Sequence, residues 1–311
     1  MELTIFDKSK QATGYFTGDI DMELGDSDAT NDFVIDDSVS MGMYIAAQGE
    51  EYGGIVEYYE DDIDMPYKGH TWRGLLNQWI IEPPEGSDHL VVGGDLNDII
   101  RTVTADVLGG FFDASEEKCG IEAYKYSFAI GCSVLDGLMD LCSDHGCKLV
   151  IRNVVIDERL HVVLSAKKAE EKTLSEESFD AKTTISNMGI NHLICAGTGE
   201  LKNRLKVHLY MWPDGSVRQN PYYTGFAERQ AFYDYNTQDD LAELIKSGGE
   251  RLKSLASYKK MEVNTAYVDA DVGDYLQVKK NGMVVNQPVV RKILSGSNGI
   301  YSIEAKMKGE S

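Results

Sequence analysis

Short runs of β-branched and aromatic residues, separated by Gly, Asp and Asn, occupy both ends of the chain and restrict its fold most. In the first 85 residues these runs read LTIF, TGYFTG, IDMEL, DFVI, GMYIAAQG and GGIVEYYE. Runs of this length and composition, bounded by turn residues, predict β-strands. The pattern returns from about residue 186, where the Asp214-Gly215 dipeptide is typical of a hairpin turn. Both ends of the chain are therefore predicted to be β-rich.

The middle of the chain alternates helical and strand patterns. Asp95 and Ser133 each precede an apolar stripe of helical spacing, which predicts that both residues cap helices. The runs CKLVIRNVVI and RLHVVLSA then predict a β-hairpin. A further helix is predicted over 237–257, opening at Thr237 with Asp240 three residues on in the manner of a capping box.

These patterns predict a mainly β fold with an α+β insertion, divided into three parts. Residues 1–85 form a first β-domain, which ends at Pro83-Pro84 because neither proline can continue a strand ladder. Residues 86–185 form the inserted α+β module. Residues 186–311 form a second β-domain, on which the helix at 237–257 packs.

Acidic residues concentrate near the N-terminus. The chain of 311 residues has a formal net charge of −21, and residues 1–66 hold 17 Asp or Glu against 2 Lys or Arg. Such a block argues against a nucleic-acid-binding protein, because that affinity comes from Lys and Arg neutralising phosphates. Two interpretations stay open: a solvated face, or a surface that must not adhere to a passing anion.

The composition also indicates where the protein is made. No run of about eighteen apolar residues is present, so no membrane-spanning helix is predicted. The opening MELTIFDKSK lacks the basic and apolar blocks of a signal peptide. Five cysteines, an odd number and few for this length, are predicted to be reduced thiols in a protein made in a cytoplasm.

Motifs that carry chemistry are weak. The cluster Cys142-Ser-Asp-His145-Gly-Cys147 has the spacing of no closed zinc finger, so buried cysteines are expected. The run Asp26 to Asp32 resembles the start of a calcium loop but lacks its sixth-position Gly and twelfth-position Glu, so a turn is expected. No catalytic residue, metal ligand or cofactor site is predicted. A carboxylate pair for glycoside hydrolysis stays open, because the chain holds 51 acidic residues.

The order of several segments resembles the baseplate or tail-tip hub family of tailed bacteriophages, particularly the hub proteins of siphoviruses and of phage-like elements in Gram-positive bacteria. The resemblance covers nearly the whole chain. It rests on the segments KGHTWRGLLNQWIIEPP, GGDLNDIIRTVTAD, SFAIGCSVLDGLMDLCSDHGCKLVI, GTGELKNR, ERQAFYDYNTQDDLAELIKSGGERL, VGDYLQVKKNG and GIYSIEAKMKG.

This resemblance implies a non-enzymatic virion structural protein at the tail tip of a phage or prophage. It implies a homotrimer in which 1–85 and 186–311 are similar β-barrel tube domains, so that three chains approximate a six-fold ring. The ring would join the tail tube, or a distal tail protein, to a spike or fibre, and would also meet the tape-measure protein. Genomic DNA would pass through the ring without specific binding.

The resemblance also suggests which charged residues have roles. Six acidic residues are expected to line the lumen, where they would repel phosphate: Asp19, Asp21, Glu23, Asp26, Asp28 and Asp32. Four basic residues in the less acidic part of the chain are expected to form pairs across subunits: Lys202, Arg204, Arg218 and Arg229.

Two alternatives remain at this stage. The first is a tail-associated hydrolase of cell walls or polysaccharides. The second is the spike-base protein of a contractile injection or type VI secretion system, whose physical requirements are the same as those of a phage hub.

Overall fold

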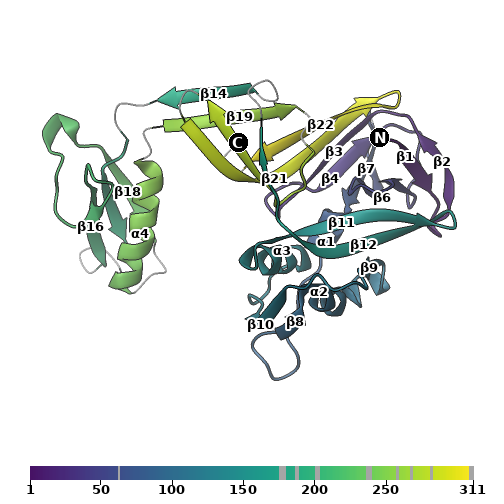
Figure 1. The fold of residues 1–311 in the computed structure, drawn as a ribbon, viewed down its shortest axis with the longest axis horizontal. Coiled ribbons are helices and arrows are strands. Elements are labelled where there is room, and N and C mark those ends of the chain that lie inside the picture. Colours follow the sequence, from purple (N-terminus) through teal and green to yellow (C-terminus); the bar gives the residue numbers. More distant parts are fainter. Residues whose placement is uncertain are drawn as a thin grey trace. The chain divides into compact units, whose positions relative to one another are not determined.

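The chain folds into several sheets and is mainly β, as predicted (Figure 1). A computed structural model describes residues 1–61, 64–174, 180–185, 189–199, 204–235, 240–256, 259–266, 269–280 and 283–307. The chain divides into two compact units. Unit 1 comprises Met1–Ala181 and Val263–Ser311, and unit 2 comprises Lys182–Glu262.

The opening strands of unit 1 pair in antiparallel fashion, in the order β3-β4-β7-β6-β5-β1-β2. Along β3 the side chains of Ile20, Met22 and Leu24 are buried in a core that the other strands complete, while Asp21 is exposed. This alternation follows from the two-residue period of a strand. The strands are β1 (Leu3–Phe6), β2 (Ala12–Phe16), β3 (Ile20–Gly25), β4 (Asp32–Ile35), β5 (Tyr44–Ala47), β6 (Gly53–Tyr59) and β7 (Tyr67–Thr71).

The closing strands continue the same sheet. The long strand β21 pairs with β20 near its start, and with both β22 and β3 further on. Within the described residues the sheet has 13 strands, and β21 joins its opening and closing parts. Figure 1 shows β21 and β22 running beside β3. The remaining strands of this group are β13 (Glu171–Thr173), β14 (Asp180–Ile185), β19 (Lys259–Ala266), β20 (Tyr275–Lys280), β21 (Met283–Ser297) and β22 (Ile300–Met307).

The α+β module of unit 1 begins as its local signals predict. The carboxylate of Asp95 accepts a hydrogen bond from the Asn97 backbone N–H (3.0 Å), and the hydroxyl of Ser133 accepts one from that of Asp136 (3.0 Å). Both predicted N-caps are confirmed. The module and the helix before it comprise α1 (Trp72–Asn77), β8 (Val91–Asp95), α2 (Leu96–Thr104), the 3₁₀ turn η1 (Val107–Gly109), β9 (Phe112–Ala114), β10 (Glu122–Ser127), α3 (Val134–Asp144), β11 (Cys147–Ile156) and β12 (Arg159–Lys168).

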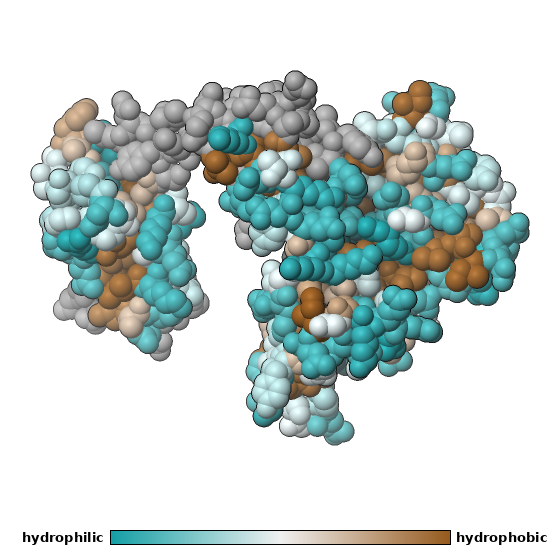
Figure 2. All heavy atoms as spheres, viewed as in Figure 1, coloured by the Kyte–Doolittle hydropathy of each residue, from teal (hydrophilic) through white to brown (hydrophobic). Residues whose placement is uncertain are grey.

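The predicted hairpin of the module is also confirmed. β11 and β12 pair over their full length, from Cys147 opposite Lys168 to Ile156 opposite Arg159. Apolar side chains of both strands join those of α1, α2 and α3 in one core. Hydrophilic residues cover most of the face of unit 1 that Figure 2 shows.

Unit 2 contains a four-stranded sheet with one helix packed on it, together with most of β14 and the first half of β19. The strand order is β17-β16-β15-β18, and Leu244 and Leu252 of the helix share a core with Leu193 and Leu209 of the sheet. The elements are β15 (His192–Ala196), β16 (Lys206–Met211), β17 (Val217–Arg218), the 3₁₀ turn η3 (Gly225–Ala227), β18 (Gln230–Asp234) and α4 (Leu241–Leu255).

The predicted start of this helix is wrong. The N-cap is Asp240, whose carboxylate accepts a hydrogen bond from the Ala242 backbone N–H (2.7 Å). Thr237, the predicted cap, lies outside the described residues. The helix therefore spans Leu241–Leu255 rather than 237–257, because an Asp at the N-cap satisfies the first backbone donors on its own.

The two compact units have other boundaries than the three predicted ranges. The closing strands β20 to β22, predicted to belong to 186–311, lie in unit 1 because β21 pairs with β3. Only residues 182–262 separate from the rest. That 1–85 and 186–311 contain similar tube domains stays a prediction.

The glycine pair in α4 provides a test of the packing in unit 2. A Cβ at Gly248 would lie 2.5 Å from the Cys195 Sγ and 2.9 Å from the Leu209 Cδ1, whereas a Cβ at Gly249 would meet only Val217, at 4.0 Å. Both Gly→Ala changes gain the same helix propensity. We therefore expect Gly248→Ala to be less stable than Gly249→Ala by about 1–3 kcal/mol, the usual cost of overpacking.

The difference would be measured from urea unfolding of the full chain, together with hydrogen exchange of the β15 and β16 amides. Equal stabilities would show that the helix does not pack this closely on the sheet.

Candidate functional site

Three of the six predicted lumen residues lie on one face of the large sheet. Asp21 and Glu23 alternate with the buried residues of β3, and Asp32 begins the neighbouring strand β4 on the same face. The carboxylate of Glu23 accepts a hydrogen bond from the Thr30 backbone N–H (2.9 Å), which ties β3 to the end of its turn. Burial raises the pKa of Asp32, and the nearby Glu23 adds to this rise while His70 opposes it. We call Asp21, Glu23 and Asp32 the acidic face.

The other three predicted lumen residues lie in turns. Asp26 and Asp28 are in the β3–β4 turn, where the Asp28 backbone N–H donates to the Asp26 carboxylate (3.2 Å). This is the turn expected from the sequence, and the buried Asn31 side chain bridges it by donating to the carbonyls of Asp26 and Ala29. Burial, followed by repulsion from Asp28, raises the pKa of Asp26. Asp19 lies at the other end of β3, where its N–H donates to Asp36 (2.8 Å).

Basic residues that the sequence reasoning missed border the acidic face. Arg291 of β21 reaches Glu23 with 3.5 Å between Nε and Oε1. On β7, Lys68 pairs with Glu60, and His70 contacts Glu57. The surface therefore stays negative, and the basic residues at its borders neutralise only part of its charge. No local signal could reveal these neighbours, since strand register places them together.

The predicted basic interface residues all fall in unit 2, and two of the four are already paired. Arg204 forms an ion pair with Asp234 and donates to the Gly197 carbonyl (2.9 Å). Arg218 pairs with Asp214 (2.8 Å) and stacks on Trp212.

The other two members of the set differ from these. Arg229 contacts the Phe226 ring and backbone carbonyls, and in the described part of the chain it forms no ion pair with a carboxylate. Lys202 lies outside the described residues. Of the predicted set, only Arg229 is described and has its charge unpaired.

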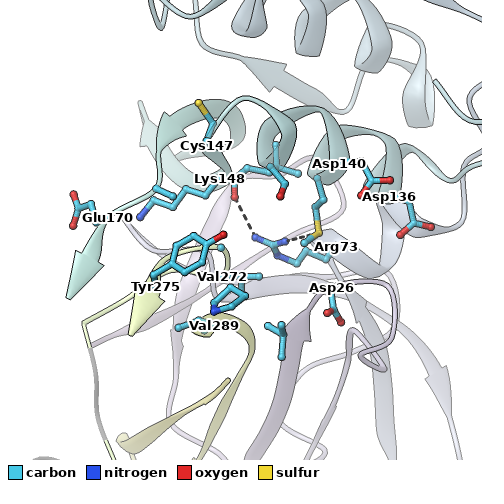
Figure 3. A pocket seen from close by; sticks show the side chains of 18 of the residues that line it. Asp26, Arg73, Asp136, Asp140, Cys147, Lys148, Glu170, Val272, Tyr275 and Val289 are labelled. Carbon is cyan, nitrogen blue, oxygen red and sulfur yellow. Dashed lines mark hydrogen bonds between the residues drawn. The ribbon is translucent and has the colours of Figure 1, made fainter. Parts of the chain in front are cut away.

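A pocket of about 460 Å³ opens in unit 1 between α3, β11, β20 and β21 (Figure 3). The guanidinium of Arg73 lies at its base with 1% of the residue exposed, and forms a buried ion pair with Glu51. Its remaining donors reach the Gly25 carbonyl (3.4 Å), the Leu149 carbonyl (3.3 Å) and the Met139 sulfur (3.4 Å). Arg73 therefore has no donor left for a ligand, and its role is to hold three parts of unit 1 together.

A second buried network joins β11 to the turn before β20. The ammonium of Lys148 donates to Asp274 (2.6 Å) and Asp271 (2.9 Å), and Arg152 donates to Asp271 (2.7 Å). Lys292 of β21 lies 3.9 Å from Asp271. Burial alone would raise the pKa of Asp271, but Arg152 and Lys148 hold it below its ordinary value. Burial opposes the charge of Lys148, yet its hydrogen bonds to Asp274 and Asp271 raise its pKa.

Two dispersed histidines come together in unit 2. Buried His192 contacts Glu228 through Nδ1 (2.6 Å) and His208 through Nε2 (2.8 Å), and its ring stacks on Tyr210. A carboxylate beside an imidazole can hold the ring in one orientation. The sequence separation of these residues hides the cluster, which forms because β15 and β16 pair with His192 opposite Tyr210.

The described residues contain no group of three or more His, Cys, Asp or Glu placed to hold a metal ion. Cys142 is buried in α3, as expected, and its surroundings raise its pKa because burial disfavours the thiolate. Among the described helices, none is long and apolar enough to cross a bilayer.

Solved structures of phage tail proteins have an architecture similar to that of this chain. The 43 kDa tail protein of prophage MuSo2 from Shewanella oneidensis is 12% identical with a TM-score of 0.50, and the match covers 99% of this chain and 98% of that one. The chain has the fold of a prophage tail protein. The resemblance inferred from the sequence is thus confirmed at the level of the fold.

Two other tail proteins are similar at lower scores. One is from Neisseria meningitidis (13% identity, TM-score 0.46, covering 99% and 96% of the two chains). The other is a prophage tail protein from Listeria monocytogenes (11% identity, TM-score 0.47, covering 100% and 95%). No family model and no curated protein matches the sequence.

The buried network makes a prediction about acid stability. Because the pKa of Asp271 is lower in the folded chain than in the unfolded one, its ionisation stabilises the fold fully above the unfolded value of about 3.9. This stabilisation is lost progressively as the pH falls from that value through the lower pKa of the folded chain. We expect Asp271→Asn to lower the free energy of unfolding at pH 7 by about 3 kcal/mol, since it breaks a buried pair. The free energy of unfolding of this variant should also fall less than that of the wild type as the pH is lowered from neutral to acidic values.

The measurement is urea unfolding of the full chain at a series of pH values. The matched control is Asp98→Asn, which breaks the exposed pair with Arg101 and should cost less than about 1 kcal/mol. If the free energy of unfolding of Asp271→Asn fell with decreasing pH as steeply as that of the wild type, the ionisation of Asp271 would not contribute to stability.

Proposed function

We propose that this chain is a non-enzymatic structural hub of a phage or prophage tail tip. Three copies form a ring that joins the tail tube, or a distal tail protein, to the tip spike or fibre, with the tape-measure protein as a further neighbour. Genomic DNA passes through the ring. The observation that carries this proposal is the fold, which the chain shares with a prophage tail protein over 99% of its length.

The continuous sheet of unit 1 supports a tube-forming role. Opening and closing strands belong to one sheet because β21 pairs with β3, so a single subunit presents a broad, connected wall. Copies placed around an axis could enclose a channel with such walls. This geometry suits an assembly component better than it suits a cleft for chemistry.

The charge of this wall supports the passage of DNA. The acidic face lies on the side of β3 and β4 away from the core, where Asp21 and Asp32 are exposed and Glu23 is partly buried beside Arg291. Carboxylates on a lumen would repel phosphate over a Debye length of about 8 Å at physiological salt. We propose that the acidic face, with Asp26 and Asp28 at its end, lines the lumen.

The ring is tested by negative-stain imaging and light scattering of the purified chain. We expect particles with three-fold or pseudo-six-fold symmetry and the mass of three chains. A hydrolase of the tail tip would instead release soluble fragments from bacterial cell walls, with activity abolished by one carboxylate substitution. That result would contradict the structural hub and support the hydrolase.

The lumen assignment makes a separate prediction. We expect the combined changes Asp21→Lys, Glu23→Lys and Asp32→Lys to make the assembled ring retain double-stranded DNA, with an affinity that falls steeply as salt rises. The wild-type ring should retain none in the same filter assay.

The matched control places the same charge change on the exposed residues Glu116, Glu117 and Asp157 of the module. This control variant should bind DNA at least about tenfold more weakly than the variant with lysines on the acidic face, because its added charges do not converge on a channel. Equal binding by the two variants would show that the acidic face does not line the channel.

A further inference from the structure

Unit 2 presents one aromatic side chain almost completely to solvent. Phe226, in the turn η3, is 86% exposed. Its loop is nevertheless held in place: the buried Asn191 side chain donates to the Ala227 carbonyl (2.8 Å) and accepts from the Arg229 backbone N–H (2.9 Å). The Arg229 guanidinium donates to the Phe226 carbonyl (2.5 Å) and lies 5.1 Å from its ring. Phe226 and Arg229 therefore form a preorganised pair, here called the knob.

A knob of this composition is typical of an interface anchor. Aromatic residues and arginine dominate the energetic centres of protein interfaces, and little conformational entropy is lost when the anchor is already ordered. Arg229 also has no carboxylate partner within the described residues, so its charge is available to one.

The pocket of unit 1 has the complementary chemistry. Val272, Val289, Val290 and Pro288 supply apolar walls on the side of the closing strands (Figure 3). Its volume of about 460 Å³ exceeds the roughly 150 Å³ of an engineered cavity that holds benzene, so a phenyl ring and part of a guanidinium fit.

The rim of this pocket is acidic. Four carboxylates line it: Asp26, Asp136, Asp140 and Glu170. The two cations of the pocket already have partners. Arg73 pairs with Glu51, and Lys148 pairs with Asp271 and Asp274. Asp140 is a rim carboxylate on α3 that a cation would stabilise. Burial raises its pKa, its neighbours Asp136 and Asp144 add to the rise, and in the described residues it forms no ion pair.

The charges of the two units point to a second copy of this chain as the partner. Residues 182–262 hold 11 Lys or Arg against 9 Asp or Glu, and the remaining residues hold 19 against 42. Unit 2 of one copy is thus attracted to unit 1 of another. A contact between two different surfaces repeats from copy to copy and closes into a ring when the rotation allows it.

We propose that Phe226 of one copy enters the pocket of unit 1 in a neighbouring copy, where Arg229 pairs with Asp140. This inference rests on the proposed ring and names the contact that closes it. The apolar walls receive the ring of Phe226, and the acidic rim receives the charge of Arg229.

The test is a charge exchange read by light scattering and imaging of the full chain over a dilution series. We expect Phe226→Ala to raise the dissociation constant of the assembly by about 30-fold or more, the level of an interface hot spot. Arg229→Glu and Asp140→Lys should each weaken it, and the double variant carrying both changes should recover most of the loss. Circular dichroism would verify that every variant is folded.

The matched control is Tyr124→Ala. Tyr124 is 85% exposed and has Lys125 beside its ring, but it lies on β10, which contributes no residue to the pocket. Its removal should leave the dissociation constant unchanged. Rings that form equally well in Phe226→Ala and in both charge variants would overturn the contact and leave the hub intact.

Other outcomes separate the two proposals. Oligomers that obey the charge exchange but are not rings of three would support the contact and reject the hub. A wild-type chain that stays monomeric at its highest soluble concentration would reject both.

Discussion

The antiparallel pairing of β21 with β3 is the constraint on which the rest of unit 1 depends. It joins residues 291–296 to residues 20–25, so the chain must return from its far end before the sheet is complete. Pairing at such sequence separation costs loop-closure entropy before its hydrogen bonds form. Once formed, it turns two groups of strands into a single wall. The proposed tube function relies on this continuity.

Buried charges hold the module against that wall. Lys148 and Arg152 of β11 meet Asp271 and Asp274 of the closing segment, and Arg73 binds Glu51 at the base of the pocket. Desolvation makes such networks weak contributors to net stability, but breaking one partner is costly. We infer that their value here is specificity, since a shift of the closing segment along β11 would separate Lys148 and Arg152 from Asp271. The same pairs leave the rim carboxylates of the pocket without internal cations.

The two units carry different charge, and this difference connects the proposed functions. Unit 1 bears all of the excess negative charge, which suits a surface beside DNA. Unit 2 is close to balanced, with Arg204 and Arg218 already neutralised by Asp234 and Asp214. Arg229 differs from them because its guanidinium supports the exposed Phe226 instead of a carboxylate. Attraction between unlike units of neighbouring copies would offset the repulsion that a ring of acidic chains must overcome.

The sequence by itself determined the local elements. Asp95 and Ser133 cap α2 and α3, and the hairpin of β11 and β12 has its predicted residues, because caps, apolar periods and turns act within a few residues of one another. The acidic block and the mainly β composition are likewise properties of the chain itself.

Only the tertiary structure decided which strands pair and which side chains meet. It moved β20 to β22 into unit 1, placed Asp21 and Asp32 on one face, and brought His192 to His208. It also gave Arg204 and Arg218 partners within their own unit and formed the pocket above Arg73. The physical reason is that strand pairing depends on the free energy of contacts between distant segments, and a pattern of neighbouring residues does not specify the partner strand.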